Sequence, residues 1–247
     1  MKYNKAKVLI VTEGLKPESR IMNSLFSVYK LDAKHEIVHY GTDIYVLHDE
    51  MFINESPDDM DLLQVLKSRE KNSDIKIMLE QKFTDILLIF DFDPQATTFE
   101  PKKIRSMTEH FTDSTDMGKL YINYPMIEAY YHMKSIPDAS YNERTASLSE
   151  LKVSNKDDGY KARVDKESCF RSKKALNRYE CDEVLRQNIE KGWLISGGFS
   201  DTELPNCCLI LDKQLERLDK EQVIHVLCTC IYYAVEYNSY YLPQLKA

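Results

Sequence analysis

Glycine is scarce in this chain, and its spacing excludes two common nucleotide-binding motifs. The 247 residues include 7 glycines. None of them is spaced as G-x-G-x-x-G, the dinucleotide-binding fingerprint, or as G-x-x-x-x-G-K-S/T, the phosphate-binding P-loop. We therefore expect neither kind of nucleotide site.

A long apolar run is missing from the N-terminus as well. Residues 1–7 include three lysines and precede a short apolar run, Val8–Val11. This run is too brief for the hydrophobic core of a signal peptide or for a membrane span. We therefore expect a cytoplasmic protein without a membrane partner.

The 6 cysteines contain no C-x-x-C step. In a chain without a secretory signal, such thiols are more often reduced than paired in a disulfide framework. The close pairs Cys207-Cys208 and Cys228-x-Cys230 leave a zinc site as an alternative. Because a helix is predicted around residues 228–230, the last two thiols would lie on different faces, and buried core thiols are the favoured interpretation.

Length and composition are typical of one large globular domain, or of a domain with an appendage. Hydrophobic residues make up 43% of the chain and charged residues 30%, which excludes a disordered protein. The net charge of −7 argues against nucleic-acid binding over the whole surface, since affinity for phosphates depends largely on Lys and Arg.

Two apolar segments, Val8–Val11 and Asp85–Phe90, predict strands buried on both faces of a parallel sheet. The first is followed at Pro17 by apolar residues at helical spacing. This alternation predicts an α/β fold with parallel strands at the centre of its sheet, flanked by helices. The other predicted elements are strands at 36–40 and 119–125 and helices beginning near a cap at 56–59 and at 126–133, 168–192 and 219–238.

Three carboxylates directly follow the two buried strands: Glu13 after the first, and Asp91 and Asp93 after the second. Ligands collect at the carboxyl ends of parallel strands, and the chain bends before Pro94, so both aspartates can approach one site. Clustered carboxylates repel one another unless a cation neutralises them. Oxygen ligands without His or Cys suit Mg²⁺ or Mn²⁺. Alone, Asp-x-Asp is equally typical of turns and helix caps.

Together these motifs resemble the Toprim domain of topoisomerases, bacterial primases and several nucleases. In that family an apolar strand ends in Glu-Gly, as residues 8–14 do, and a later strand ends in Asp-x-Asp, as residues 88–93 do. With Lys16, Glu18 and the segment 121–128, the chain looks most like the compact Toprim proteins of the RloB and OLD-nuclease kind in bacterial anti-phage systems.

The resemblance covers residues 7–134, about half of the chain, and implies a Toprim-like catalytic domain at 1–134. We expect residues 135–247 to form a mainly helical extension packed on that domain. Gln95 stands where topoisomerase-type members carry the Gly of Asp-x-Asp-x-Gly, so the loop lacks that flexible position. Topoisomerase and primase activities are not expected, because the chain is too short for gate domains and has no preceding zinc ribbon.

The resemblance also implies roles for single residues. Glu13 would act as general acid or base or as a metal ligand. Asp91 and Asp93 would hold one or two divalent ions, and Glu18 would join them if a second ion binds. The metal, Mg²⁺ or Mn²⁺, would stabilise the phosphate during hydrolysis and help to generate hydroxide. Lys16 would contact a phosphate oxygen, with a solvated loop lysine as the alternative.

Asn123 and Glu128 are candidates for a supporting role near the same sheet edge. Glu128 would lie in the first turns of the helix after Pro125. The alternative for this residue is a plain helix-start carboxylate, which the helix dipole favours.

Positive charge concentrates at residues 152–178, where Lys and Arg exceed Asp and Glu by five. Because an acidic site repels a polyanion, we expect this segment to carry cations to the mouth of the site. A solvated helix or loop is the alternative. The candidate nucleic-acid-binding residues are Lys161, Arg163, Arg171, Lys173 and Lys174.

Two functions are compatible with these features. The first is a Mg²⁺- or Mn²⁺-dependent nuclease, a hydrolase that cleaves DNA or structured RNA such as tRNA as a toxic effector in antiviral defence. Its partners would be the nucleic-acid substrate and either a defence-system ATPase or sensor or a second copy of the chain. The second is a non-catalytic Toprim-like interaction or regulatory module whose Tyr-rich C-terminal segment binds a protein. The intact carboxylates favour the first.

Overall fold

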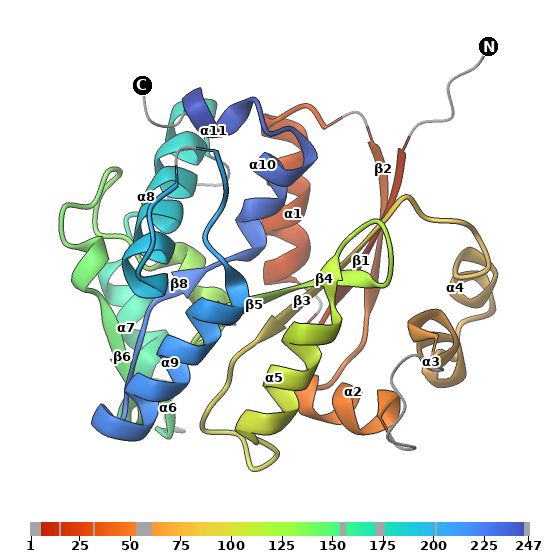
Figure 1. The fold of residues 1–247 in the computed structure, drawn as a ribbon, viewed down its shortest axis with the longest axis horizontal. Helices are drawn as coiled ribbons and strands as arrows, with labels where there is room; N and C mark the ends of the chain where they lie inside the picture. Colours follow the sequence, from red (N-terminus) through yellow and green to blue (C-terminus); the bar gives the residue numbers. More distant parts are fainter. Residues whose placement is uncertain are drawn as a thin grey trace. The chain divides into compact units, whose positions relative to one another are not determined.

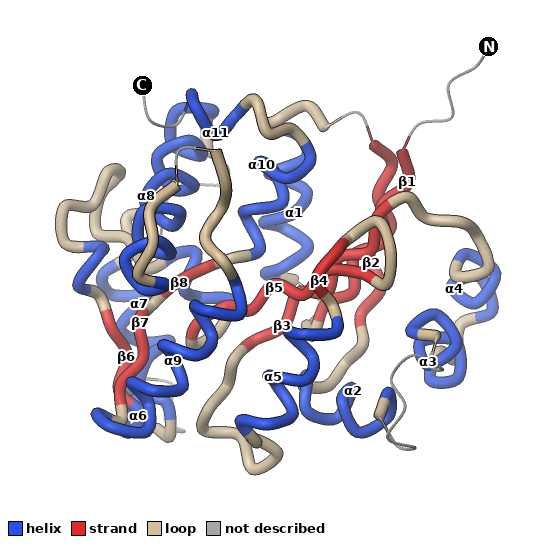
Figure 2. Tube along the Cα trace, viewed as in Figure 1, coloured by secondary structure: helices blue, strands red, loops and turns tan. Residues whose placement is uncertain are grey.

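The computed structural model describes residues 6–14, 16–31, 33–52, 61–153, 157–170, 176–200 and 202–244. Over these residues the protein is a mixed α/β protein whose central sheet is mainly parallel (Figures 1 and 2). As far as they are described, Met1–Ser19, Asp32–Phe90 and Thr98–Tyr121 form one unit. Arg20–Leu31, Asp91–Thr97 and Ile122–Ala247 form a second one.

Strand β1 (Ala6–Thr12) lies between two parallel neighbours, β2 (Ala33–His39) and β3 (Asp85–Asp91). The four residues Val8–Val11 have no exposed surface. A continuous apolar run is the sequence pattern of a strand that is covered on both faces. The predictions of β1 and β3 as buried parallel strands are therefore confirmed.

The strand order places a topological switch at β1. The sheet order is β2-β1-β3-β5-β4, with β4 (Thr112–Asp113) and β5 (Gly118–Tyr124) paired antiparallel. From β1 the chain goes to β2 on one side and later to β3 on the other. In open α/β sheets, ligands bind outside the carboxyl ends of the strands at such a switch. The ends of β1 and β3 are thus the favoured place for a site.

The helices of the first unit begin at residues that suit helix N-termini. Side chains of Asp43, Asp61 and Asn72 accept backbone N–H groups in the first turns of α2 (Ile44–Met51), α3 (Leu62–Arg69) and α4 (Ser73–Met78). Helix α5 (Pro101–His110) starts with proline and was not among the predicted elements. The predicted cap at 56–59 lies outside the described residues.

Helix α1 (Pro17–Val28) buries the apolar face that its spacing predicts. Figure 1 shows α1 beside α10 (Tyr233–Tyr237) and α11 (Tyr241–Gln244). Phe26 stacks on Tyr233 at 6.0 Å between ring centroids, and Tyr29 packs on Tyr241 at 5.2 Å. Several rings of the Tyr-rich C-terminal segment therefore fill the core of the second unit and do not present an open aromatic surface.

The second unit is mainly helical. Its sheet elements are the antiparallel pair β6 and β7 and strand β8, which pairs antiparallel with the end of β5. No helix of the described residues is both long and apolar enough to cross a membrane. The further elements are β6 (Thr145–Ser147), β7 (Val223–His225), β8 (Leu227–Cys228), α6 (Leu148–Leu151), α7 (Gly159–Glu167), α8 (Arg178–Ser196), α9 (Cys207–Glu221) and the 3-10 turns η2 (Ile127–Tyr131), η3 (Tyr141–Glu143) and η4 (Cys230–Tyr232).

The prediction of one helix over 219–238 is wrong. Helix α9 ends at Glu221, and Gln222 adopts a left-handed conformation with φ of 57°. Strands β7 and β8 follow before η4 and α10. Residues 223–228 form a nearly continuous apolar run, and periodicity alone cannot distinguish a buried strand from a helix in such a run.

Two other helix predictions also need correction. The segment predicted as a helix at 126–133 forms the shorter turn η2. The helix predicted at 168–192 is α8, which starts later, at Arg178, where Asn177 and Glu180 make a reciprocal capping box.

Cys228 and Cys230 lie close together, contrary to the prediction that they face different sides of a helix. Their Sγ atoms are 3.4 Å apart, which exceeds the disulfide bond length of about 2.05 Å. Both residues are buried. The Sγ of Cys228 also lies 3.3 Å from Oδ1 of Asn123. These contacts are those of packed core thiols, the favoured interpretation of the sequence.

A largely buried ionic network fixes α7 against η2. Arg144 donates to Asp138 at 2.7 Å and to Glu167 of α7 at 3.1 Å. The same Glu167 oxygen lies 3.2 Å from Nε2 of His132, which directly follows η2. Burial and the nearby charge of Arg144 lower the pKa of His132 to about 4, so its imidazole is neutral near pH 7. The network thereby sets how residues of α7 meet residues of η2.

Gly192 of α8 provides a test of the packing in the second unit. A Cβ atom there would lie 2.5 Å from Oη of Tyr232 and 2.7 Å from Cγ of Pro205. Tyr232 cannot yield easily, because its hydroxyl donates to the carbonyl of Asn188 at 2.8 Å. Because two contacts would be shorter than 3.0 Å, we expect Gly192→Ala to cost about 2–3 kcal/mol through overpacking, which outweighs the ~1 kcal/mol that Ala gains in helix propensity.

The matched control is Gly198→Ala, where an added Cβ meets nothing within 4 Å. Thermal melts of the two variants should differ by several degrees, with only Gly192→Ala lowered. Equal melting temperatures would show that α8 does not pack as described.

Candidate metal centre

The backbone of Glu13 is held on both sides by the sheet. Its N–H donates to the carbonyl of Ile89 in β3 at 3.3 Å, and its carbonyl accepts from Gly41, just past β2, at 3.2 Å. The Thr12 hydroxyl donates to the carbonyl of Gly14 at 2.8 Å. Glu13 therefore continues the line of β1 into the loop, and its side chain is half-buried.

The Asp91-Phe92-Asp93 turn is fixed by the end of β5. The carbonyl of Pro125 accepts the N–H groups of Phe92 and Asp93 at 3.1 and 3.0 Å. Asp93 has a φ of 40°, in the left-handed region that Asp tolerates better than most residues. The amide of Gln95 donates to Oδ1 of Asp93 at 2.9 Å. The positive φ thus falls on Asp93 itself, and Gln95, where the Toprim pattern has Gly, orients its carboxylate.

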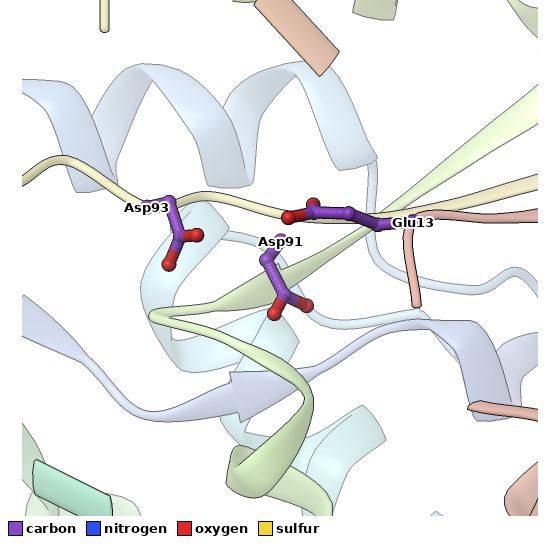
Figure 3. Close-up of side chains that lie close together, drawn as sticks. All are labelled: Glu13, Asp91 and Asp93. Carbon is purple, nitrogen blue, oxygen red and sulfur yellow. The ribbon is translucent and has the colours of Figure 1, made fainter. Parts of the chain in front are cut away.

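The three carboxylates predicted to form the site converge in the structure (Figure 3). One oxygen each of Glu13, Asp91 and Asp93 lies within 4.8 Å of the other two. Ligands on opposite sides of an ion are about 4.2 Å apart for Mg²⁺ and up to about 5.2 Å apart for Ca²⁺, from their usual metal–oxygen distances. The set is therefore the right size for one divalent cation, with a small inward shift for Mg²⁺.

Glu18 lies in the first turn of α1, five residues after Glu13 in the sequence. Its carboxylate oxygens would be 3.1 and 3.2 Å from a Cβ placed on Gly14, so glycine leaves the room that this carboxylate occupies. Glu18 is buried, and its Oε2 has no hydrogen-bond partner among the described residues. Leaving a buried acceptor unsatisfied costs about 1–3 kcal/mol. A cation or water beside Gly14 would remove this cost.

Asn123 and Glu128 line the end of β5 and the start of η2. Asn123 is fully buried, and its carbonyl accepts the N–H of Phe92 at 3.0 Å. Its Nδ2 has no hydrogen-bond partner among the described residues. Oε1 of Glu128 is 3.3 Å from Nζ of Lys161, while its Oε2 is buried without a hydrogen-bond partner in the described chain.

Lys161, one of the predicted nucleic-acid-binding residues, interacts electrostatically with the acidic turn Asp91-Phe92-Asp93. Partial desolvation lowers the pKa of Lys161, but the negative charges of Glu128, Asp91 and Asp93 outweigh that effect. The pKa of Lys161 therefore lies above its usual value. The ammonium group of Lys161 thus lies in the electrostatic field of these carboxylates.

The other predicted cations have different positions. Lys16 is exposed in the loop before α1. Arg163 lies against Glu150, with Nε 2.8 Å from its carboxylate, and donates to the carbonyl of Thr145 at 2.6 Å. It therefore supports the local fold of the second unit. Three predicted residues lie outside the described part of the chain: Arg171, Lys173 and Lys174.

Arg20 is an exposed residue of α1 that the sequence analysis did not single out. Burial raises the pKa of Tyr131 in η2 to about 12, and the charge of Arg20 acts in the opposite direction, so the two residues are neighbours. No motif points to Arg20.

Comparisons with known proteins give no match: no protein-family model, no curated protein and no solved structure matches the chain. The Toprim resemblance therefore rests on the sequence motifs alone.

The carboxylate cluster predicts how the protein responds to metal. Mn²⁺ or Mg²⁺ at 100 times its dissociation constant should stabilise the folded chain by about 2.7 kcal/mol, a rise of several degrees in melting temperature. Asp91→Asn should abolish this rise. In metal-free buffer the variant should melt at or above the wild-type temperature, since one mutual repulsion is relieved.

The control is Asp116→Asn, which removes an exposed carboxylate from the turn between β4 and β5. This variant should keep the wild-type response to metal. A strong loss of stability of Asp91→Asn without metal would instead assign Asp91 a structural role.

Proposed function

We propose that the protein is a divalent-metal-dependent nuclease with a Toprim-like catalytic centre. The observation that carries the proposal is the convergence of Glu13, Asp91 and Asp93 at the carboxyl ends of two adjacent parallel strands. Two of the three flank the topological switch of the sheet. Oxygen-only ligation with no His or Cys in the group favours Mg²⁺ or Mn²⁺.

In this proposal, different residues of the site bind the metal and accept a proton during phosphodiester hydrolysis. A bound divalent ion would supply positive charge to the phosphate and favour the deprotonation of water. Asp91 and Asp93 would hold that ion, because their turn is fixed by the hydrogen bonds to Pro125. Glu13, anchored between β2 and β3, would ligate the ion or accept the proton of the attacking water. Glu18 would add negative charge for a second ion.

The substrate in this proposal is DNA or a structured RNA such as tRNA, and the cell role is a toxic effector of anti-phage defence. Support for the substrate class comes from Lys161, whose ammonium can meet a phosphate oxygen beside the carboxylates. Support for the defence role comes from the motif resemblance alone. The packing of Tyr232 and Tyr233 in the core removes two rings that a protein-binding module would use.

Cleavage assays test the proposal directly. Wild-type protein with Mn²⁺ should cleave supercoiled plasmid or total RNA, and chelation should stop the reaction. Glu13→Gln should reduce the rate roughly 10²–10⁴-fold, the usual contribution of a general acid or base. Asp91→Asn should remove metal-dependent cleavage altogether.

Asp116→Asn again serves as the control and should retain wild-type activity. Metal-dependent cleavage that persists in both Glu13→Gln and Asp91→Asn would overturn the nuclease proposal.

A further inference from the structure

Lys161 is brought to the acidic turn by contacts inside the second unit. The carbonyl of Pro125 accepts the N–H of Asp93 at 3.0 Å, which puts the start of η2 next to the turn. Glu128 lies in the first turn of η2, and its Oε1 is 3.3 Å from Nζ of Lys161. The carboxylates of Asp91 and Asp93 attract the same ammonium group.

The ammonium of Lys161 is free to change partners, unlike the neighbouring arginine of α7. The Lys161 side chain is 66% exposed and has a flexible four-carbon stem with three donors at its end. Arg163 is held by Glu150 and by the carbonyl of Thr145. Glu128 therefore acts as a restraint that keeps one mobile cation near the turn.

We propose that Lys161 is the built-in counter-cation of Asp91 and Asp93, and that an arriving phosphodiester anion draws its ammonium away and so strengthens divalent-cation binding. This inference rests on the proposed function, because it assumes that these aspartates hold the metal. It adds a dependence of metal binding on substrate. Without substrate, the metal competes with the positive charge of Lys161 for the aspartates. With a phosphodiester bound, this competition is removed.

The physical basis is linkage between two ligands of one site. A lysine ammonium and a divalent ion both gain from the same carboxylates, so each weakens the binding of the other. A phosphate oxygen offers the ammonium another partner and removes this competition. Linkage is reciprocal, so metal must strengthen phosphodiester binding by the same factor. This competition would keep the metal occupancy of the site low until a substrate is present.

The first measurement is Mn²⁺ affinity without nucleic acid, by isothermal titration calorimetry at low ionic strength, where charge effects are least screened. Lys161→Met should tighten Mn²⁺ binding roughly two- to fivefold, the range expected for one partly exposed charge pair. The matched control is Lys166→Met, which removes one positive charge from the same helix. Lys166 donates to the carbonyl of Asp157, and its variant should bind Mn²⁺ as wild type does.

The second measurement is the affinity for a fluorescent 12-nucleotide phosphorothioate DNA, by anisotropy with and without Ca²⁺. Ca²⁺ should strengthen binding in wild type and in Lys166→Met. In Lys161→Met the gain should be at least twofold smaller. The gain in Glu128→Gln should lie between those of wild type and Lys161→Met, since this variant keeps the ammonium group and removes only the carboxylate that restrains it.

The outcomes separate this inference from the proposed function. Mn²⁺ binding that depends on Asp91 but is equal in Lys161→Met and Lys166→Met would overturn the inference and leave the metal centre standing. Weaker Mn²⁺ binding in Lys161→Met would overturn it as well. Mn²⁺ binding that is absent, or unchanged in Asp91→Asn, would remove the metal centre and the inference together.

Discussion

Repulsion among carboxylates at the ends of parallel strands is the constraint on which the rest of the site depends. Two unit negative charges 4.8 Å apart repel by about 3 kcal/mol at an effective dielectric constant of 20. The parallel pairing of β1 with β3 fixes where Glu13 and Asp91 leave the sheet, so the backbone cannot relax this repulsion. The positive charge of Lys161 partly offsets this repulsion, and in the proposed function a divalent ion would offset it further.

The local structure around the carboxylates also holds them near the strand ends. Asp93 adopts a left-handed conformation, and Gln95 orients its carboxylate. Gly14 leaves room for the carboxylate of Glu18, whose buried oxygen lacks a donor among the described residues. Each feature keeps negative charge near the strand ends at a cost to the folded protein. Strained residues of this kind cluster at sites that bind ligands.

The positions of residues at strand ends could be predicted from the local sequence pattern. Contacts that depend on how separate elements pack could not. Glu13 and Asp91 stand at the ends of short, β-branched apolar runs that alternate with helical patterns, and this alternation favours parallel strands whose carboxyl ends meet. Lys161 and Glu128 meet because a buried network with His132 and Arg144 sets α7 against η2, which no local pattern records. Residues 223–228 were mistaken for a helix because a continuous apolar run fits either structure.

The most direct test of the account is a crystal structure grown with Mn²⁺, with anomalous diffraction recorded at the manganese edge. The account predicts an anomalous peak bound by oxygens of Glu13, Asp91 and Asp93 at about 2.0–2.6 Å. It also predicts that the Lys161 ammonium lies farther from both aspartates than in metal-free crystals. Carboxylates that point apart, or a peak that avoids all three of them, would contradict it.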